Sequence, residues 1–183
     1  MGQSIIPGFD AQQQIDRNYE RELRDGQEFE DFVCDLLGSQ FGLNFTTFRS
    51  QQAQYRRGES RCGIEIKLDK SFLRTRRLWI ECLGRKYPWG TYVHEGINRS
   101  CWLYLIGCYD VIFVFSTRTL RRWRDKYKPT IRENNSRTSQ GFLLPGEKAS
   151  HIATAIIVKH PSEGWTIRDS YEDWQLGIPF EED

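Results

Sequence analysis

The sequence has little of the cysteine, histidine and methionine chemistry on which many metal and redox sites depend. It contains five cysteines, three histidines and one methionine in 183 residues. No two cysteines form a C-x-x-C pair, the spacing typical of zinc and redox sites. The odd number of cysteines and their largely apolar surroundings indicate reduced, buried thiols. We therefore expect no zinc site and a cytoplasmic location, with the scattered histidines in loops or on the surface.

Long apolar runs are also missing, and so is an excess of charge of either sign. No apolar run approaches the ~20 residues of a membrane span. The first seven residues lack the charged start and apolar middle of a signal peptide, so we expect no association with a membrane. The formal net charge is +1, from 26 basic and 25 acidic residues. A uniformly basic nucleic-acid coat protein is therefore excluded.

The basic residues are nevertheless clustered along the chain. Local basic patches on a neutral protein suit a molecule that grips phosphates on one side only. We predict that two of these clusters contact nucleic acid through their arginines. These arginines are Arg56, Arg57, Arg118, Arg121, Arg122 and Arg124.

Hydrophobic residues make up 38% of the chain and aromatic residues 14%, enough for one folded domain over residues 1–183. Periodicity and turn residues predict the order of the elements. We expect a loose arm (1–9), helices (10–24 and 26–37), a strand (43–48), a loop (50–62), two strands (64–68 and 78–83), an irregular crossing (84–100), two buried strands (102–106 and 111–115), a helix (117–127), a polar loop (128–140), a strand or extended piece (141–145), a helix (149–158) and an exposed tail (161–183). The fold class is α/β or α+β, with a mixed sheet flanked by helices.

Two of these predicted strands, residues 64–68 and 78–83, carry charged residues within apolar runs. Successive side chains of a strand point to opposite faces. Glu65 and Lys67 therefore share one face of the first strand, opposite its isoleucines. Glu81 lies on the face of the second strand opposite Leu78, Ile80 and Cys82.

The connection between the two strands, residues 69–77, is short enough for a hairpin. Pairing Leu68 with Leu78 would place Glu65 directly opposite Glu81, with Cβ atoms about 4.5–5.5 Å apart. Two carboxylates this close repel by up to ~4 kcal/mol at an effective dielectric near 20, and a cation between them reverses the sign. Two such carboxylates beside a lysine suit a Mg²⁺ site for phosphodiester cleavage.

Other interpretations of these residues stay open. Glutamate and lysine often fill the solvent face of an amphipathic strand, so an ordinary surface pair is the alternative. Glu30 lies on the shoulder of an apolar stripe in the helix 26–37, where it is either a site residue or a solvated one. Asp69 either joins the site at its periphery or caps the turn after the first strand.

The same residues resemble the PD-(D/E)XK nuclease superfamily, over about residues 26–124. The resemblance is carried by the helix Phe29-Glu30-x-x-Val33-x-x-Leu36-Leu37, by Gly63-Ile64-Glu65-Ile66-Lys67 and by Trp79-Ile80-Glu81. The combination, followed by Trp102-Leu-Tyr-Leu-Ile-Gly107, is also similar to small phage or prophage-borne members. It implies a restriction-endonuclease-like mixed sheet flanked by helices, and a Mg²⁺-dependent DNA endonuclease in which Mn²⁺ can substitute.

The resemblance assigns roles residue by residue. Glu65 and Glu81 would be the strand acids that hold the metal, Glu30 the helix acid, and Lys67 the catalytic lysine. The usual lysine position, two residues after the third-strand acid, is Leu83 here. An alternative alignment takes Glu65-x-Lys67 as the motif itself, with Glu59 as the preceding acid. A homodimer that cuts both strands is a further expectation, and a nuclease fold that only binds nucleic acid or protein is the alternative function.

Overall fold

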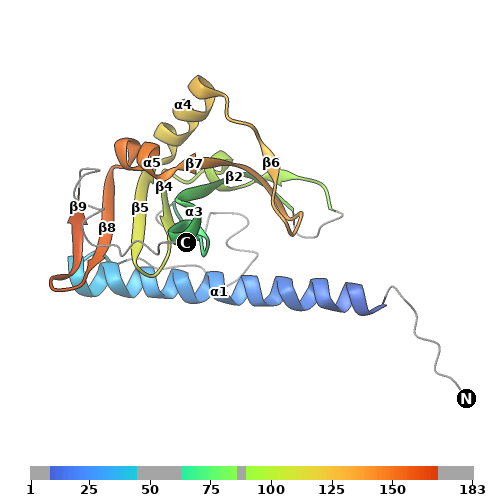
Figure 1. The fold of residues 1–183 in the computed structure, drawn as a ribbon, viewed down its shortest axis with the longest axis horizontal. Helices are drawn as coiled ribbons and strands as arrows, with labels where there is room; N and C mark the ends of the chain where they lie inside the picture. Colours follow the sequence, from blue (N-terminus) through green and yellow to red (C-terminus); the bar gives the residue numbers. More distant parts are fainter. Residues whose placement is uncertain (1–8, 45–62, 86–89, 169–183) are drawn as a thin grey trace, which may run out of the picture.

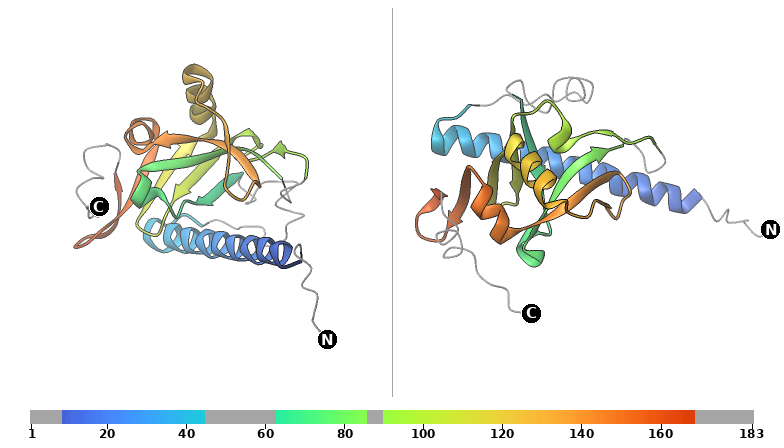
Figure 2. Two further views of the ribbon diagram at one scale, coloured as in Figure 1. Left: turned by 45° about the vertical axis from the view of Figure 1, so that its right-hand side comes forward. Right: turned by 90° about the horizontal axis from the view of Figure 1, so that it is seen from above.

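The computed structural model describes residues 9–44, 63–85 and 90–168. One long helix lies along a five-stranded sheet, and a four-stranded sheet lies on the other side of that sheet (Figures 1 and 2). The elements are α1 (Phe9–Phe41), β1 (Ile64–Leu68), α3 (Phe72–Thr75), β2 (Arg77–Gly84), β3 (Val93–His94), η1 (Gly96–Asn98), β4 (Leu103–Gly107), β5 (Val111–Ser116), α4 (Thr117–Tyr127), β6 (Arg132–Glu133), β7 (Ser139–Pro145), α5 (Gly146–Ile152), β8 (Ala155–His160) and β9 (Gly164–Arg168). The predicted mixed α+β class is confirmed.

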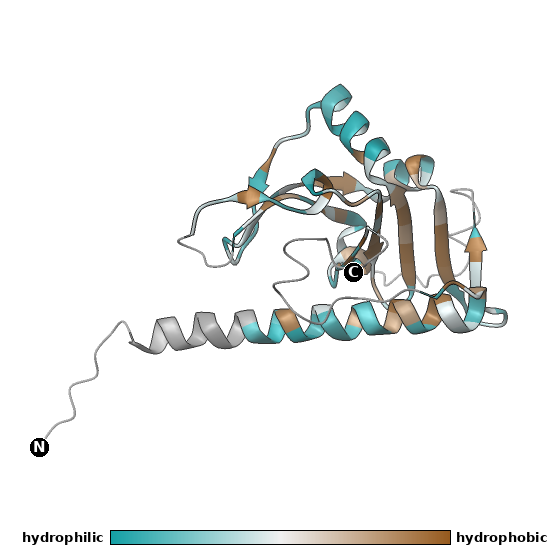
Figure 3. Cartoon of the chain, turned by 180° about the vertical axis from the view of Figure 1, so that it is seen from behind, coloured by the Kyte–Doolittle hydropathy of each residue, from teal (hydrophilic) through white to brown (hydrophobic). Residues whose placement is uncertain are grey.

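The larger sheet has the strand order β1-β4-β5-β8-β9, and the smaller sheet β3-β2-β7-β6. In the larger sheet β1 and β4 are parallel, and the other neighbours are antiparallel. All pairs of the smaller sheet are antiparallel. The strands predicted at 102–106 and 111–115 are confirmed as β4 and β5. Figure 3 shows that the central strands of the larger sheet are predominantly hydrophobic, as expected for strands covered on both faces.

Two apolar layers hold α1, the larger sheet and the smaller sheet together. On one face of the larger sheet, α1 contributes Phe29, Val33, Leu36 and Leu37, which pack against Ile64, Ile66, Leu105, Ile112 and Ile157. On the other face, Tyr104, Ile106, Phe113 and Phe115 pack against Leu78, Ile80, Phe142 and Leu144 of the smaller sheet. Burying each large apolar side chain contributes roughly 1.5–3 kcal/mol. The alternation in β1 thus places Ile64 and Ile66 in the core with α1, and Glu65 and Lys67 on the face toward the smaller sheet.

The hairpin predicted from residues 64–68 and 78–83 is wrong. β1 pairs in parallel with β4, whereas β2 pairs with β3 and β7 in the other sheet. The predicted faces are nevertheless correct, because Leu78, Ile80 and Cys82 are buried and the residues between them are more exposed. Alternation fixes which face a residue occupies, but it does not fix which strand lies alongside.

The predicted break between two N-terminal helices is also wrong, since α1 is continuous through Asp25 and Gly26. A glycine inside a helix costs about 1 kcal/mol, which the packing of the following turns outweighs. The Asp25 carboxylate forms an ion pair with Lys70. The helix continues past residue 37, its predicted end, and stops before Gly42, which has φ +68° and tolerates this left-handed conformation.

The C-terminal third differs from the prediction in two places. The helix predicted at 149–158 ends at Ile152, and residues 155–160 form β8. The β-branched Ile156, Ile157 and Val158 suit a strand with both faces covered. Part of the predicted tail, residues 164–168, is β9, paired with β8, while residues 141–145 form a strand within β7, as one of the two expected forms.

The remaining predicted elements are confirmed, contain further short elements, or lie outside the described residues. The helix predicted at 117–127 is confirmed as α4, and its Leu120 is fully buried. The predicted crossing at 84–100 contains β3 and η1, and the predicted loop at 128–140 contains β6 and the start of β7. The arm 1–8, most of the strand predicted at 43–48, the loop 50–62 and the end of the tail lie outside the described residues. No helix in the described part of the chain is long and apolar enough to span a membrane.

Candidate functional site

Lys67 brings the two predicted strand carboxylates together. Its Nζ lies 3.1 Å from Oε1 of Glu65 and 3.7 Å from Oε2 of Glu81. Glu65 and Lys67 come from the edge strand β1 of the larger sheet, on the face toward the smaller sheet, and Glu81 comes from β2. The predicted convergence of two acids and an ammonium is therefore present. It arises between two sheets instead of across one hairpin.

The three groups differ in their contact with water. The side chain of Glu65 is 0% exposed, that of Glu81 18% and that of Lys67 29%. A carboxylate taken fully out of water is costly unless a counter-charge lies beside it. The site therefore has a buried acidic end and an open end where Lys67 and Glu81 reach solvent. The alternative of an ordinary solvated strand face does not describe Glu65.

Tyr104 adds a buried hydroxyl group beneath the site. It is the register partner of Glu65 on β4, and it is fully buried. Its hydroxyl oxygen has no hydrogen bond of normal geometry within the described residues. Burial raises the pKa of Tyr104 well above its usual value, and the charges of Glu81 and Glu65 raise it further, while Lys67 and the backbone of Glu81 oppose the shift. Tyr104 is thus a neutral, poorly satisfied polar group against the two carboxylates.

A third carboxylate, Glu95, lies at the open end of the site and was not predicted from the sequence. Burial raises the pKa of Glu95, and Arg99 and Lys67 lower it, whereas Glu81 raises it. Arg99 binds both carboxylate oxygens, at 2.6 Å each. A Cβ on Gly84 would lie 2.6 Å from Cγ of Glu95 and 3.5 Å from Oε1 of Glu81, so both acids crowd the same glycine.

A tight backbone contact holds Glu81 in place. Gly96 has φ +51°, and a Cβ there would lie 2.2 Å from the carbonyl oxygen of Glu81. The amide nitrogens of Glu95 and of the Asn98 side chain donate to the carbonyl of Cys82, at 3.2 and 2.9 Å. Only glycine satisfies both demands at position 96, so the segment that carries Glu95 and Gly96 positions the site from outside β2. In the sequence, Glu95 is distinguished only by the glycine that follows it, and a glutamate before a glycine does not by itself indicate a site.

Glu30 is not brought to the other acids. Its helix α1 packs on the face of the larger sheet that carries Ile64 and Ile66, opposite Glu65. The described residues contain no cluster of three or more His, Cys, Asp or Glu side chains that could hold a metal ion. Asp69 has the second of its two predicted roles. Its carboxylate accepts hydrogen bonds from the Ser71 amide (3.0 Å) and hydroxyl (2.7 Å) and from the Trp79 amide (2.8 Å), so it caps the turn.

The arginines of α4 fall into two groups. Arg121 donates to the carbonyl oxygens of Ile97 and Arg99, both at 2.5 Å, and Arg124 donates to Oδ1 of Asn98 at 2.8 Å. These two arginines therefore brace the segment that carries Glu95. The other two, Arg118 and Arg122, are exposed. The predicted Arg56 and Arg57 lie outside the described residues.

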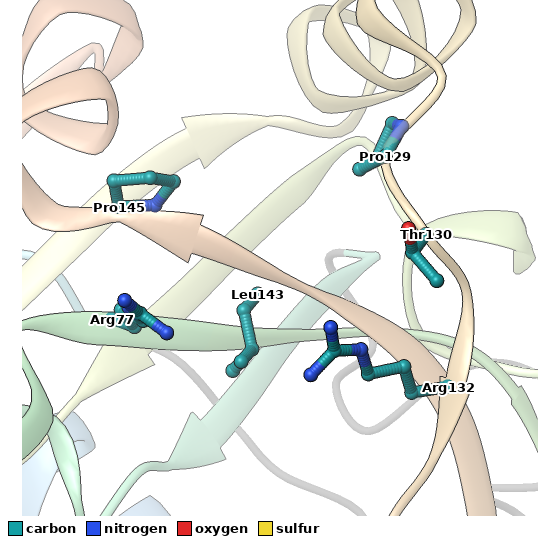
Figure 4. Close-up of a pocket in the computed structure, with 6 residues that line it drawn as sticks. All are labelled: Arg77, Pro129, Thr130, Arg132, Leu143 and Pro145. Atoms are coloured by element: carbon teal, nitrogen blue, oxygen red, sulfur yellow. The ribbon is translucent and has the colours of Figure 1, made fainter.

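A separate pocket of 230 Å³ lies on the smaller sheet (Figure 4). Figure 4 shows Arg77 and Arg132 on either side of Leu143, with Pro129, Thr130 and Pro145 completing the lining. None of the lining residues is acidic, so the pocket favours an anion. Arg132 lies in the same row of the sheet as Glu81, with Gly141 between them. Adjacent strands are about 4.8 Å apart, which places the two Cα atoms about 10 Å from each other.

Comparisons with known proteins add no relative: no family model matches this chain, and no curated protein or solved structure matches it. The resemblance to the PD-(D/E)XK superfamily therefore stays a prediction. In one respect the fold departs from that resemblance, because the strands that carry Glu65 and Glu81 belong to different sheets.

Proposed function

We propose that the protein is a Mg²⁺-dependent DNA endonuclease that hydrolyses phosphodiester bonds at Glu65, Lys67 and Glu81. The observation that carries the proposal is the placement of one ammonium within 3.1 and 3.7 Å of two carboxylates, one of them fully buried. Such an arrangement is unfavourable for folding alone, since an apolar pair would fill the space at no electrostatic cost. Costly buried charges of this kind concentrate at functional sites.

The donor set fits a hard divalent cation. Glu65 and Glu81 offer carboxylate oxygens, the ligands that Mg²⁺ and Mn²⁺ prefer, and the cation would take up the negative charge that Lys67 now offsets. When bound, a divalent cation polarises a phosphate and lowers the pKa of a coordinated water. With Glu65 and Glu81 as the protein ligands, water and the substrate phosphate would complete the ligand sphere, as is usual for Mg²⁺.

The remaining groups would bind and orient the substrate. Lys67 is partly exposed and can donate to a phosphate oxygen while it keeps its contact with Glu65. The exposed Arg118 and Arg122 on α4, together with Arg77 and Arg132 at the pocket, are available for backbone phosphates. Arg121 and Arg124 are no longer candidates for this role, because they support the segment that carries Glu95.

Incubation with supercoiled, linear and branched DNA in Mg²⁺ or Mn²⁺ tests the proposal. We expect cleavage that is lost in Glu65→Gln and in Lys67→Met, and retained in Lys148→Met, which removes a lysine from the exposed pair with Glu147. Absence of cleavage on every substrate, or equal cleavage by Glu65→Gln, would contradict it.

A second candidate function is a nuclease-like fold that binds nucleic acid or a protein without cutting. Two observations favour it. Lys67 already places a positive charge within 3.1 and 3.7 Å of the two carboxylates, and residues 9–44, 63–85 and 90–168 contain no group of three or more His, Cys, Asp or Glu side chains that could hold a metal ion. Calorimetry with Mn²⁺ separates the two candidates. Binding that is lost in Glu81→Gln supports the endonuclease, and no binding supports the second function.

A further inference from the structure

Trp102 is the most exposed of the large apolar side chains in the described part of the chain, at 60%. Its backbone is nevertheless held on both sides. The Trp102 amide donates to the carbonyl of Gly63 at 2.9 Å, and its carbonyl accepts from the Thr117 amide at 3.0 Å. The residue therefore stands at a fixed position where β1, β4 and α4 all begin.

The indole ring of Trp102 lies close to the backbone at Gly63. Gly63 has φ +71°, and a Cβ there would lie 3.0 Å from Cδ1 of Trp102. The absence of a side chain at Gly63 lets the ring approach the chain closely while more than half of its surface stays open. A rigid aromatic face is a low-entropy platform for a flat ligand.

This platform lies close to the proposed catalytic site. Trp102 precedes Tyr104 by two residues, and Tyr104 is the register partner of Glu65. At about 3.3 Å per residue, the Cα of Trp102 is about 7 Å along β4 from the level of Glu65. That is close to the spacing of one nucleotide in an extended strand, so a base on Trp102 would leave a neighbouring phosphate near Glu65 and Lys67.

Positive charge accompanies the exposed ring. Arg118 follows the residue whose amide binds the Trp102 carbonyl, and Arg122 lies one turn further along α4. Both are exposed, and the first turn of α4 has no acidic residue. An exposed aromatic ring, together with exposed arginines on the helix whose first residue binds the Trp102 carbonyl, matches nucleic acid, whose bases stack and whose phosphates are anionic. A protein partner would favour a wider apolar patch.

We propose that Trp102 is a base-stacking residue and that the preferred substrate carries unpaired nucleotides next to the cleaved bond. In a duplex each base is covered by its neighbours in the stack. A single indole can therefore stack only on a base in a single strand, a flap or an open end. The inference rests on the proposed function for its link to cleavage, but base stacking on Trp102 can be measured without it.

The test is fluorescence anisotropy with a labelled single-stranded oligonucleotide, the same sequence as a duplex, and an abasic oligonucleotide of equal length, all in EDTA so that no cleavage occurs. We expect the intact protein to bind the single strand more tightly than the duplex. Trp102→Ala should weaken single-strand binding about tenfold or more, and Trp102→Phe should restore most of it. The matched control is Tyr127→Ala, which removes another exposed aromatic ring (58%) and should change binding little.

The outcomes separate this inference from the proposed function. If Trp102 acts by base stacking, Trp102→Ala and the intact protein should bind the abasic oligonucleotide equally, because that strand has no base to stack. An unchanged single-strand affinity in Trp102→Ala, an equal loss on the duplex, or no binding of any oligonucleotide by the intact protein would overturn the inference. A single-strand preference that depends on Trp102, in a protein that cleaves no DNA, would retain this inference and reject the endonuclease.

Discussion

Replacement of Lys67 by methionine would separate the electrostatic role of this residue from its packing. Methionine keeps most of the aliphatic stem and removes the ammonium. Glu65, with no exposed surface, and Glu81, 18% exposed, would then face each other without the cation that lies 3.1 and 3.7 Å from their oxygens. We expect Lys67→Met to fold less stably at pH 7, because a buried carboxylate loses its counter-charge.

The expected loss of stability in Lys67→Met depends on how far its ion pair with Glu65 is buried. Removing one partner of a buried ion pair costs about 3–5 kcal/mol. Lys67 is 29% exposed, so solvent screens part of its effect, and we expect a loss near the lower end, about 3 kcal/mol. The double variant Glu65→Gln/Lys67→Met removes both charges and should recover most of this loss. Magnesium should recover part of it as well: ligand at ten times its dissociation constant stabilises by about 1.4 kcal/mol.

Urea unfolding at pH 7, with and without Mg²⁺, measures these differences. The matched control is Lys148→Met, whose lysine pairs at 3.3 Å with Glu147 and is 54% exposed, so its loss should stay below about 1 kcal/mol. Lowering the pH should narrow the gap between Lys67→Met and the intact protein, since protonation of the glutamates removes the repulsion. Lys67 does not act as the counter-charge of Glu65 if Lys67→Met costs no more stability than the control, or if the double variant is no more stable than Lys67→Met.

Three further predictions concern other parts of the fold. Gly96→Ala should destabilise the fold by about 3 kcal/mol in urea unfolding, because its backbone is left-handed and its Cβ would lie 2.2 Å from a carbonyl oxygen. The control Gly26→Ala has open space around the new methyl group and should stabilise the fold by about 1 kcal/mol. Equal effects of the two variants would contradict the tight contact at Gly96. Burial, and then three neighbouring carboxylates, raise the pKa of Cys34 to about 11. Alkylation at pH 8, followed by mass spectrometry, should therefore be about two hundredfold slower than for a free thiol with a pKa near 8.5 and should accelerate about tenfold per pH unit; labelling at the rate of a free thiol would contradict this prediction. Arg77→Ala/Arg132→Ala should weaken DNA binding and reduce the slope of log K against log salt by about 1–2, and an unchanged slope would remove the pocket from the DNA path.

The structure confirmed several local predictions and overturned the predicted pairing of the strands. The helix 117–127 and the strands at 102–106 and 111–115 were predictable because their periodicity and boundaries are encoded by adjacent residues. The hairpin was not, since a strand's own pattern names no partner. Residues 155–160 were misassigned because a short apolar run fits a buried strand or a helix equally well until its neighbours are known.

Backbone geometry alone places Glu65 and Lys67 on one face of a strand and Glu81 on the non-apolar face of another, so these placements could be predicted from the sequence. That the three side chains meet depends on the packing of the two sheets. Two sheets packed through Tyr104, Ile80 and their neighbours bring Lys67 between the carboxylates, and the 95–99 segment folds back to add Glu95. The convergence is a product of apolar packing between layers, which no single stretch of the chain encodes.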